Sequence, residues 1–531
     1  MFLPWTGMLG ATLLLVGPLL LAALIVVPRK WVNGQVELVP RLAKLGTVSI
    51  FVLALLGPVL LIDQGYVQHT FLNWHGLQCG VYYDSLSAVV FLLVSFLGVV
   101  ITRYACTYLE GEAERGYFLK WLCVTLGFVL MLLVSGNMVQ FTMTWIATSV
   151  GLHHLLLYNS HRPSAVIAAR KKYVISRLGD LCLITSVILI YHVFGTGDFR
   201  TLFALAKAVG NSGRIPPLVT PICLLLTGAA IMKSAQFPFH SWLPDTMETP
   251  TPVSALMHAG IVNSGGFLIV RLSSVVSLCP TALDTLAVVG AFTAVFASVV
   301  MLTQASVKRM LAFSTVAQMG FMLLECGLGA YTVAVLHIIA HSLYKAHAFL
   351  TSGNAVMSGS KSSIAAGDPA AAHPGRFAMA LVSAMLVTFA TASLPGISSL
   401  GCPGELVLGA TLGMSVTYLL WRLWSTSVTP VVIATGLLLA AAVCIFYFGL
   451  HYVCHGILGY TLTQQTGFLT TNRDALTVVL VLLFGALLLF QSQLPQWSSR
   501  NWCRTLYVHA RNGFYFNTVF NRAIKSLWPV Q

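Results

Sequence analysis

The sequence predicts an all-α polytopic membrane protein with about fifteen transmembrane helices. Three observations support this prediction: 57% of the 531 residues are hydrophobic, only 8% are charged, and the mean hydropathy is +0.84. Several apolar runs reach the roughly 20 residues that an α-helix needs to cross a bilayer. A soluble protein is therefore excluded. The net charge of +14 does not indicate nucleic-acid binding, because Lys and Arg of membrane proteins gather in cytoplasmic loops.

The apolar runs set the order of the expected transmembrane helices. The first run is long, and no small-residue cleavage site clearly follows it, so we expect a retained helix and not a cleaved signal. The expected spans lie near residues 7–27, 45–63, 83–102, 117–135, 138–158, 173–194, 216–234, 252–274, 284–303, 311–328, 331–356, 377–395, 404–424, 431–458 and 476–492. We divide the chain into N-terminal transmembrane helices (1–80), a core (81–410), C-terminal transmembrane helices (411–492) and an amphipathic tail (493–531).

Basic residues in the connections orient the expected helices. Lys and Arg follow the first, fifth, ninth and last spans, whereas the loop 64–80 contains neither residue. The connection 196–215 is an exception, with Arg200, Lys207 and Arg214. The positive-inside rule places the N-terminus outside and the C-terminus, with the amphipathic tail, in the cytoplasm.

Two segments do not have the composition of spans. Residues 358–376 are rich in Gly, Pro and small side chains, which is typical of a flexible linker between two sets of helices. The tail after residue 493 combines aromatic with basic residues. This combination indicates an interfacial amphipathic helix or a docking surface for a partner, with ordinary membrane anchoring as the alternative.

The segment from Lys233 to Arg271 carries the strongest functional signal. It contains His240, His258 and four prolines between two apolar runs. Prolines break a helix and free its carbonyls, and a broken helix survives in hydrocarbon only where protein or internal water surrounds it. We therefore predict a broken transmembrane helix that holds Lys233 inside the membrane, as is common in ion transport. The alternative is a lysine that snorkels from a helix end to the interface.

A second candidate path lies on the predicted span 331–356. His337, His341 and Lys345 are spaced four residues apart, so they share one face of a helix. Because histidine changes charge near neutral pH, two imidazoles that lead to an amine can pass protons. The alternative is a packed polar seam without transport.

Acidic side chains in apolar segments complete the candidates. Asp180 needs a partner, and both Arg177, three residues earlier, and Lys233 qualify. We predict that Asp180 pairs with Lys233 directly or through water, and that Arg177 competes for it. Asp84 opens a helix, where it either complements the helix dipole or takes part in transport. His240 is a further candidate.

Cysteine and histidine spacing argues against a metal centre. The eleven cysteines are scattered, with no CxxC pair and no Cys/His cluster at zinc spacing. We expect no metal site, no cofactor and no disulfide framework in this chain. We also expect no catalytic residue of its own.

Four motifs point to a known family. Between about residues 80 and 400 the chain contains RLGD, KSAQFPFHSWLPDTMETPTPVSALMHA, SVKRMLAFSTVAQMGFM and HIIAHSLYKAHAFLTSG, in that order. They resemble the antiporter-like subunits of respiratory complex I and of Mrp-type cation antiporters. The resemblance implies that residues 81–410 form an antiporter-like core of two inverted five-helix repeats, each with a broken helix. It also implies that Lys233 is the central lysine of the first half-channel, and that His258, His337, His341 and Lys345 form the connecting path.

The chain departs from that family at two positions. The family has a glutamate after a tryptophan in the fifth helix, whereas this chain has Ile146 or Thr148 there, in MTWIATSVGLHHLLLYN. The family ends its second broken helix with a lysine, whereas LPGISSLGCPGELV places Pro403 at that lysine and Glu405 close by. Glu405 is therefore a further candidate.

The stretch WIATSVGLHHLLLY and the short aromatic tail resemble one branch, the DabB membrane subunits of bacterial inorganic-carbon accumulation complexes. This implies a multi-pass protein of the bacterial inner membrane that conducts H⁺ or Na⁺, and the positive-inside rule then makes its N-terminus periplasmic. It implies a DabA-like zinc partner subunit, related to β-carbonic anhydrases, that converts CO2 to bicarbonate. The zinc is then expected in the partner. The alternatives are an antiporter-like subunit of a respiratory or Mrp-type complex, an enzyme with its own zinc, and a scaffold that only anchors the partner.

Overall fold

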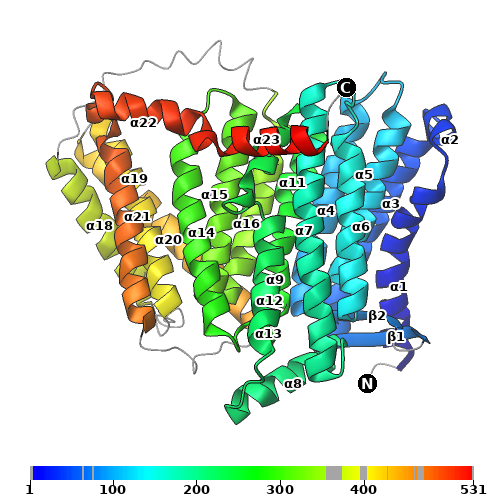
Figure 1. Cartoon of the computed structure of the whole chain (residues 1–531). Helices are drawn as coiled ribbons and strands as arrows, with labels where there is room; N and C mark the ends of the chain where they lie inside the picture. The colour runs from blue at the N-terminus through cyan, green and yellow to red at the C-terminus, as the bar shows by residue number, and fades with distance from the viewer. Residues whose placement is uncertain are drawn as a thin grey trace.

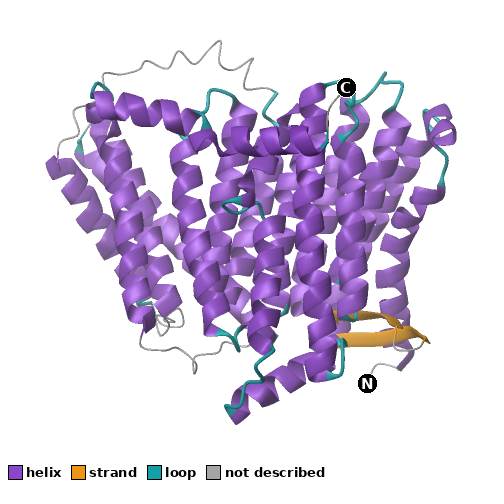
Figure 2. Ribbon diagram, in the orientation of Figure 1, coloured by secondary structure: helices purple, strands orange, loops and turns teal. Residues whose placement is uncertain are grey.

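The computed structural model describes residues 4–62, 65–74, 77–353, 374–394, 403–426, 428–459, 461–462 and 472–528. These residues form a bundle of long helices that run between two faces (Figures 1 and 2). One face carries α22 (Asn501–Arg511) and α23 (Phe516–Leu527), and we call it the C-terminal face. The opposite face carries the hairpin of β1 (Tyr66–Trp74) and β2 (Leu77–Asp84) together with α8 (Phe199–Ser212), and we call it the hairpin face.

The remaining helices follow the predicted order along the chain. The N-terminal set is α1 (Pro4–Ala23), α2 (Arg29–Gly34) and α3 (Leu38–Leu56). The core contains α4 (Ser85–Tyr108), α5 (Arg115–Leu133), α6 (Met138–Leu156), α7 (Pro163–Phe194), α9 (Val219–Lys233), α10 (Trp242–Asp245), α11 (Thr251–Ala259), α12 (Ser264–Arg271), α13 (Ser273–Val276), α14 (Pro280–Met301), α15 (Val307–Gly327) and α16 (Tyr331–Leu350). The C-terminal set is α18 (Pro374–Ala392), α19 (Pro403–Thr426), α20 (Pro430–Leu458) and α21 (Asn472–Trp497).

Thirteen helices in the described part of the chain are long and apolar enough to cross a membrane. The predicted spans 138–158 and 216–234 are also helices, α6 and α9, but they are not among the thirteen. Polar side chains lower the hydropathy of α6, and α9 has only 15 residues because the helix breaks after Lys233. The all-α polytopic fold is confirmed, whereas the count of about fifteen spans is not.

The predicted break after Lys233 is present. The backbone turns at Ala235, where φ is +51°, and passes through two 3-10 turns and the short α10 before α11 begins at Thr251. The carbonyl of Ile231, freed by the break, accepts a hydrogen bond from the Gln236 amide at 2.9 Å. A buried break with paired carbonyls is the form that hydrocarbon tolerates. The second predicted break and most of the predicted linker fall on residues 395–402 and 354–373, which lie outside the described residues.

The hairpin is a difference from the sequence prediction, which treated residues 64–80 as a loop. Its strands pair antiparallel from Tyr66 opposite Asp84 to Trp74 opposite Leu77, with a register shift between Thr70 and Leu72. Side chains of a strand alternate between two faces. Val67 and Val81 accordingly point into the bundle and are buried.

The buried apolar side chains form separate clusters. A large cluster joins the N-terminal helices to α4–α16, and a smaller one holds α18, α19 and α20 together. A third cluster connects α14 and α15 to α19 and α21. The C-terminal helices therefore pack on the core through a limited contact, and a cavity remains between the two sets.

Candidate functional site

Lys233, the last residue of α9, lies buried against α6. Its ammonium donates a hydrogen bond to the backbone carbonyl of Trp145 at 3.4 Å and lies 4.2 Å from the centre of the Trp145 ring. The indole Nε1 of the same tryptophan donates to Asp180 Oδ1 at 3.0 Å. Trp145 therefore contacts both the lysine and the carboxylate.

Asp180 forms its ion pair with Arg177, at 2.7 Å, on the same face of α7. Within the described residues, no ion pair joins Asp180 to Lys233. The direct form of the predicted pair is absent from the structure, because the predicted competitor Arg177 holds one carboxylate oxygen and the Trp145 indole holds the other. A pair formed through water, or formed transiently during transport, stays a prediction.

Lys172 is a buried lysine that the sequence prediction placed in a connection. Because α7 begins at Pro163 and not near residue 173, Lys172 lies inside the bundle with 4% of its surface exposed. Its ammonium donates to the carbonyl of Ser149 at 2.6 Å and to the hydroxyl of Ser149 at 2.8 Å. Ser149 follows Thr148, one of the two positions for the missing glutamate. Proline is favoured at the first position of a helix, so Pro163 was the available signal for the earlier start.

Lys171, the neighbouring residue, connects the broken segment to the end of the chain. Its buried ammonium donates to Asp245 at 2.5 Å and also to the side chain of Asn517 in α23. The Asn517 amide donates in turn to the other oxygen of Asp245 at 2.8 Å. Nearby, the Arg170 guanidinium lies 4.7 Å from the ring centre of Trp528. The C-terminal tail is thus held against α7 and α10.

A second group of buried titratable side chains follows α16. Lys345 is fully buried and donates to the carbonyl of Leu311 at 3.3 Å. The rings of His337 and His341 are 6.0 Å apart between their centres. His258, on α11, and His341 both interact electrostatically with Lys345. The structure therefore brings these four predicted residues together, and their part in ion transport stays a prediction.

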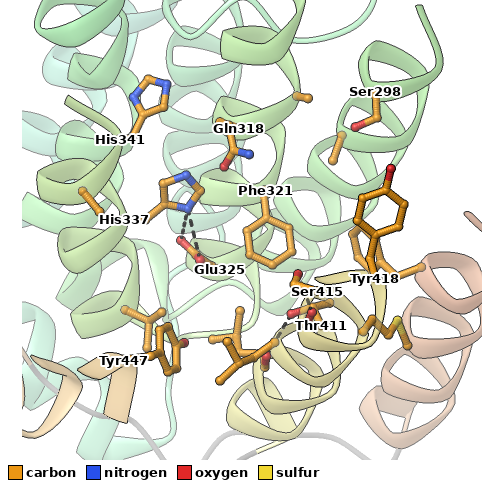
Figure 3. Close-up of a pocket in the computed structure, with 18 of the residues that line it drawn as sticks. Ser298, Gln318, Phe321, Glu325, His337, His341, Thr411, Ser415, Tyr418 and Tyr447 are labelled. Atoms are coloured by element: carbon orange, nitrogen blue, oxygen red, sulfur yellow. Dashed lines mark hydrogen bonds and ion pairs between the residues drawn. The ribbon is translucent and has the colours of Figure 1, made fainter. Parts of the chain in front are cut away.

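Glu325 joins this group and was not predicted. It lies near the end of α15 with 2% of its surface exposed, and its two carboxylate oxygens lie 3.2 and 3.1 Å from His337 Nδ1 (Figure 3). The available signal was the same as for Asp180: a lone carboxylate inside an apolar segment, FMLLECGL, needs a partner and a reason.

A cavity of about 790 Å³ adjoins Glu325, His337 and His341 (Figure 3). It lies between the core helices α14, α15 and α16 and the C-terminal helices α19, α20 and α21. Much of the wall is apolar, and further polar side chains face the space, among them Ser298, Ser314, Gln318, Thr411, Ser415, Tyr418, Tyr447 and Gln491. This combination provides both room and hydrogen-bonding partners for water.

The three secondary candidates have different surroundings. Asp84 caps α4 by accepting from the Ser87 amide at 2.8 Å and forms a buried ion pair with Arg271 at 2.6 Å, which favours the structural interpretation. His240 is buried among aromatic rings, 5.8 Å from the Phe237 ring centre. Glu405 lies in the first turn of α19, where it interacts electrostatically with Tyr447. In the residues that the structure describes, no group of three or more His, Cys, Asp or Glu could hold a metal ion.

Known proteins support the resemblance predicted from the motifs. The family model "NADH:quinone oxidoreductase/Mrp antiporter, TM" matches residues 135–434. A Halothiobacillus neapolitanus protein named "Probable inorganic carbon transporter subunit DabB2" is 35% identical over 85% of this chain and 81% of its own length. NADH-ubiquinone oxidoreductase chain 5 of Arabidopsis thaliana is 34% identical over 58% of this chain, but over only 47% of its own length.

A solved structure supports the fold. A chain of the Mrp complex from Dietzia sp. matches with a TM-score of 0.61 and 20% identity, over 97% of this chain and 60% of that chain. At this identity the likeness concerns the fold alone. The family model and the relative matched over most of its length show that the chain belongs to the NADH:quinone oxidoreductase/Mrp antiporter family of multi-pass membrane proteins and, within it, to the DabB group.

Proposed function

We propose that this chain is the cation-conducting subunit of an energy-coupled uptake complex for inorganic carbon. The conducted ion is the proton in the first instance, with Na⁺ as the alternative. The chain lies in the bacterial inner membrane, with a periplasmic N-terminus and a cytoplasmic C-terminus. The conversion of CO2 to bicarbonate takes place in a DabA-like zinc partner, and ion flow through this chain drives it.

One observation carries the proposal. A relative named as an inorganic carbon transporter subunit matches this chain over 81% of its own length, and this chain has buried lysines and histidines along its helices. A buried ammonium is costly in hydrocarbon unless partners compensate its charge, and intramembrane charged residues commonly mark ion pathways. Among the residues that the structure describes, Lys233 and Lys345 each have a backbone carbonyl within hydrogen-bonding distance and an aromatic ring in contact, and no carboxylate within ion-pair distance. A role in transport explains why lysines lie at these buried positions.

The proposed ion path has two halves: the first half-path contains Asp180 and Lys233, and the second half-path contains His258 and the group along α16. The first half-path works through Asp180. In the structure Asp180 pairs with Arg177, so Lys233 has no carboxylate within ion-pair distance among the described residues. When Asp180 turns toward Lys233, the ammonium form of the lysine is stabilised. When Asp180 returns to Arg177, the lysine can release its proton toward the second group at His258 and Lys345. Trp145, bonded to both side chains, guides the exchange.

The second candidate function is an antiporter-like subunit of a respiratory or Mrp-type complex. The identity of 34% with NADH-ubiquinone oxidoreductase chain 5 favours it, although this chain spans less than half of that protein. The neighbouring gene separates the two functions: a large Cys/His/Asp zinc protein supports carbon uptake, and quinone-reductase or Mrp subunits support the alternative.

Growth in air of bacteria that lack carbonic anhydrase tests the proposal. The chain should rescue growth only when it is expressed together with the zinc partner, because its described residues contain no metal-binding group. Abolishing the proton gradient with an uncoupler should stop radiolabelled bicarbonate accumulation. If accumulation stops when only the Na⁺ gradient is abolished, Na⁺ is the conducted ion. Rescue by this chain alone, or accumulation that survives loss of both gradients, would refute the proposal.

A further inference from the structure

The pairing of Glu325 differs from that of the other buried carboxylates in the part of the chain that the structure describes. Asp84 pairs with Arg271 and Asp180 with Arg177, and an arginine stays charged at any physiological pH. Glu325 instead contacts His337, whose charge depends on its own proton. The two side chains can therefore share one proton in a buried site without leaving an unpaired charge in hydrocarbon.

Glu325 lies at one end of the α16 group. Gln304, just before α15, donates to the carbonyl of Arg511 in α22, so α15 starts at the C-terminal face and ends near the hairpin face. α16 begins there at Tyr331 and rises by about 1.5 Å per residue, which places Lys345 about 21 Å farther from that face. His341 and His337 lie one turn apart between Lys345 and Glu325.

The cavity offers this group access to water. Both ring nitrogens of His341 are buried without a hydrogen-bond partner among the described residues, although His341 lines the cavity. Since one water occupies about 30 Å³, a space of this size holds on the order of 20 water molecules. The hydroxyl and amide groups of the wall, such as Gln318 and Ser415, can order them (Figure 3).

The start of α19 lies beside the same end of α15. A side chain at Gly404 would meet the carbonyl of Leu328 at 3.0 Å, so this turn of α19 packs on the α15–α16 connection. Tyr447 of α20 interacts electrostatically with both Glu325 and Glu405. The position at which the family resemblance expects a lysine is Pro403, directly before this contact. A carboxylate from α15 therefore stands close to the place of the missing lysine.

We propose that Glu325, held by His337, is a proton-binding site at the hairpin-face end of the second half-path, reached by water from the cavity. The titratable groups around it are His337 and His341 on α16, Tyr447 on α20, Glu405 on α19 and its neighbour Cys326. A proton from water binds the Glu325 carboxylate, passes to His337, and leaves the imidazolium for water beside His341. Only O–H and N–H bonds change. The role of this site in ion conduction rests on the proposed function, whereas the existence of the site does not.

Infrared difference spectroscopy of the purified full chain tests the site itself. On acidification the wild type should gain a protonated-carboxyl band that shifts in D2O, and Glu325→Gln should lose this band. Glu112→Gln, an exposed carboxylate in the α4–α5 connection, is the matched control and should keep it. An identical set of bands in the wild type and Glu325→Gln overturns the proposal, whatever the carbon uptake assay shows.

Uptake in cells that also express the partner tests the use of the site. Glu325→Gln should lower bicarbonate accumulation about 100-fold, as expected for loss of a positioned proton carrier. Glu325→Asp should retain part of the accumulation, and Glu112→Gln all of it. If Glu325→Gln does not fold, His337→Gln keeps the carboxylate band and should lose accumulation to the same extent. Full accumulation by folded Glu325→Gln or His337→Gln overturns the proposal. Failure of the wild type to accumulate bicarbonate counts against the proposed function instead, and the infrared result then decides whether the site exists.

Discussion

Replacing Asp180 by asparagine removes its charge but keeps the shape of the side chain. The amide oxygen can still accept the Trp145 indole hydrogen bond, which is 3.0 Å long in the wild type. The ion pair with Arg177 is lost; its side chains are 5% exposed on the aspartate and 32% exposed on the arginine. Because the guanidinium can turn partly toward solvent, we expect a loss of only about 1–3 kcal/mol in the free energy of unfolding.

The effect of Asp180→Asn on transport should be far larger than its effect on stability. An amide cannot stabilise the ammonium of Lys233 during the exchange with Arg177, so we expect uptake to fall about 100-fold with the complex still assembled. Radiolabelled bicarbonate uptake per purified complex measures this. Trp145→Phe keeps an aromatic ring over Lys233 and removes only the indole hydrogen bond, so a double-mutant cycle with Asp180→Asn should show strong coupling. Wild-type uptake by Asp180→Asn would end the idea that this carboxylate serves Lys233.

Two further predictions concern residues with opposite roles. Lys345→Ala should lower uptake about 100-fold, because the amine is removed from the path. The chain should still co-purify with its partner, because alanine suits a helix well. Unchanged uptake would make Lys345 structural. Asp84→Ala should lower the free energy of unfolding by about 3–5 kcal/mol in thermal unfolding, because it leaves the buried Arg271 without its carboxylate, and uptake per folded molecule should stay near wild type. A stable Asp84→Ala chain without uptake would place Asp84 in the path.

The sequence predicted the features that depend on local signals. Each of the fifteen predicted spans overlaps a helix of the structure, because hydropathy is read from neighbouring residues. The prolines around His240 located the break after Lys233, because proline acts on its own helix. The family motifs then supplied the roles expected for the lysines and histidines.

The features that sequence did not predict depend on contacts between distant segments. The sequence analysis placed Lys172 in a connection between spans. Its contact with Ser149 depends on the packing of α7 against α6, which the sequence does not show. Glu325 and His337 are separated by the α15–α16 turn, so their contact requires the antiparallel packing of those helices. The link from Lys171 to Asn517 spans most of the chain. No spacing rule predicts contacts of this kind.

Three buried lysines of the core give the missing fifth-helix glutamate a physical context. Lys172, Lys233 and Lys345 each direct the ammonium to a backbone carbonyl, of Ser149, Trp145 and Leu311 respectively. A carbonyl is a dipole, and it holds an ammonium less firmly than a carboxylate does. Lys171, by contrast, has a carboxylate partner in Asp245 and lies where the tail is attached. Among the described residues, Lys233 and Lys345 of the proposed path therefore have backbone-carbonyl partners, which stabilise the ammonium less than the carboxylate of Lys171 does and let the proton leave more easily.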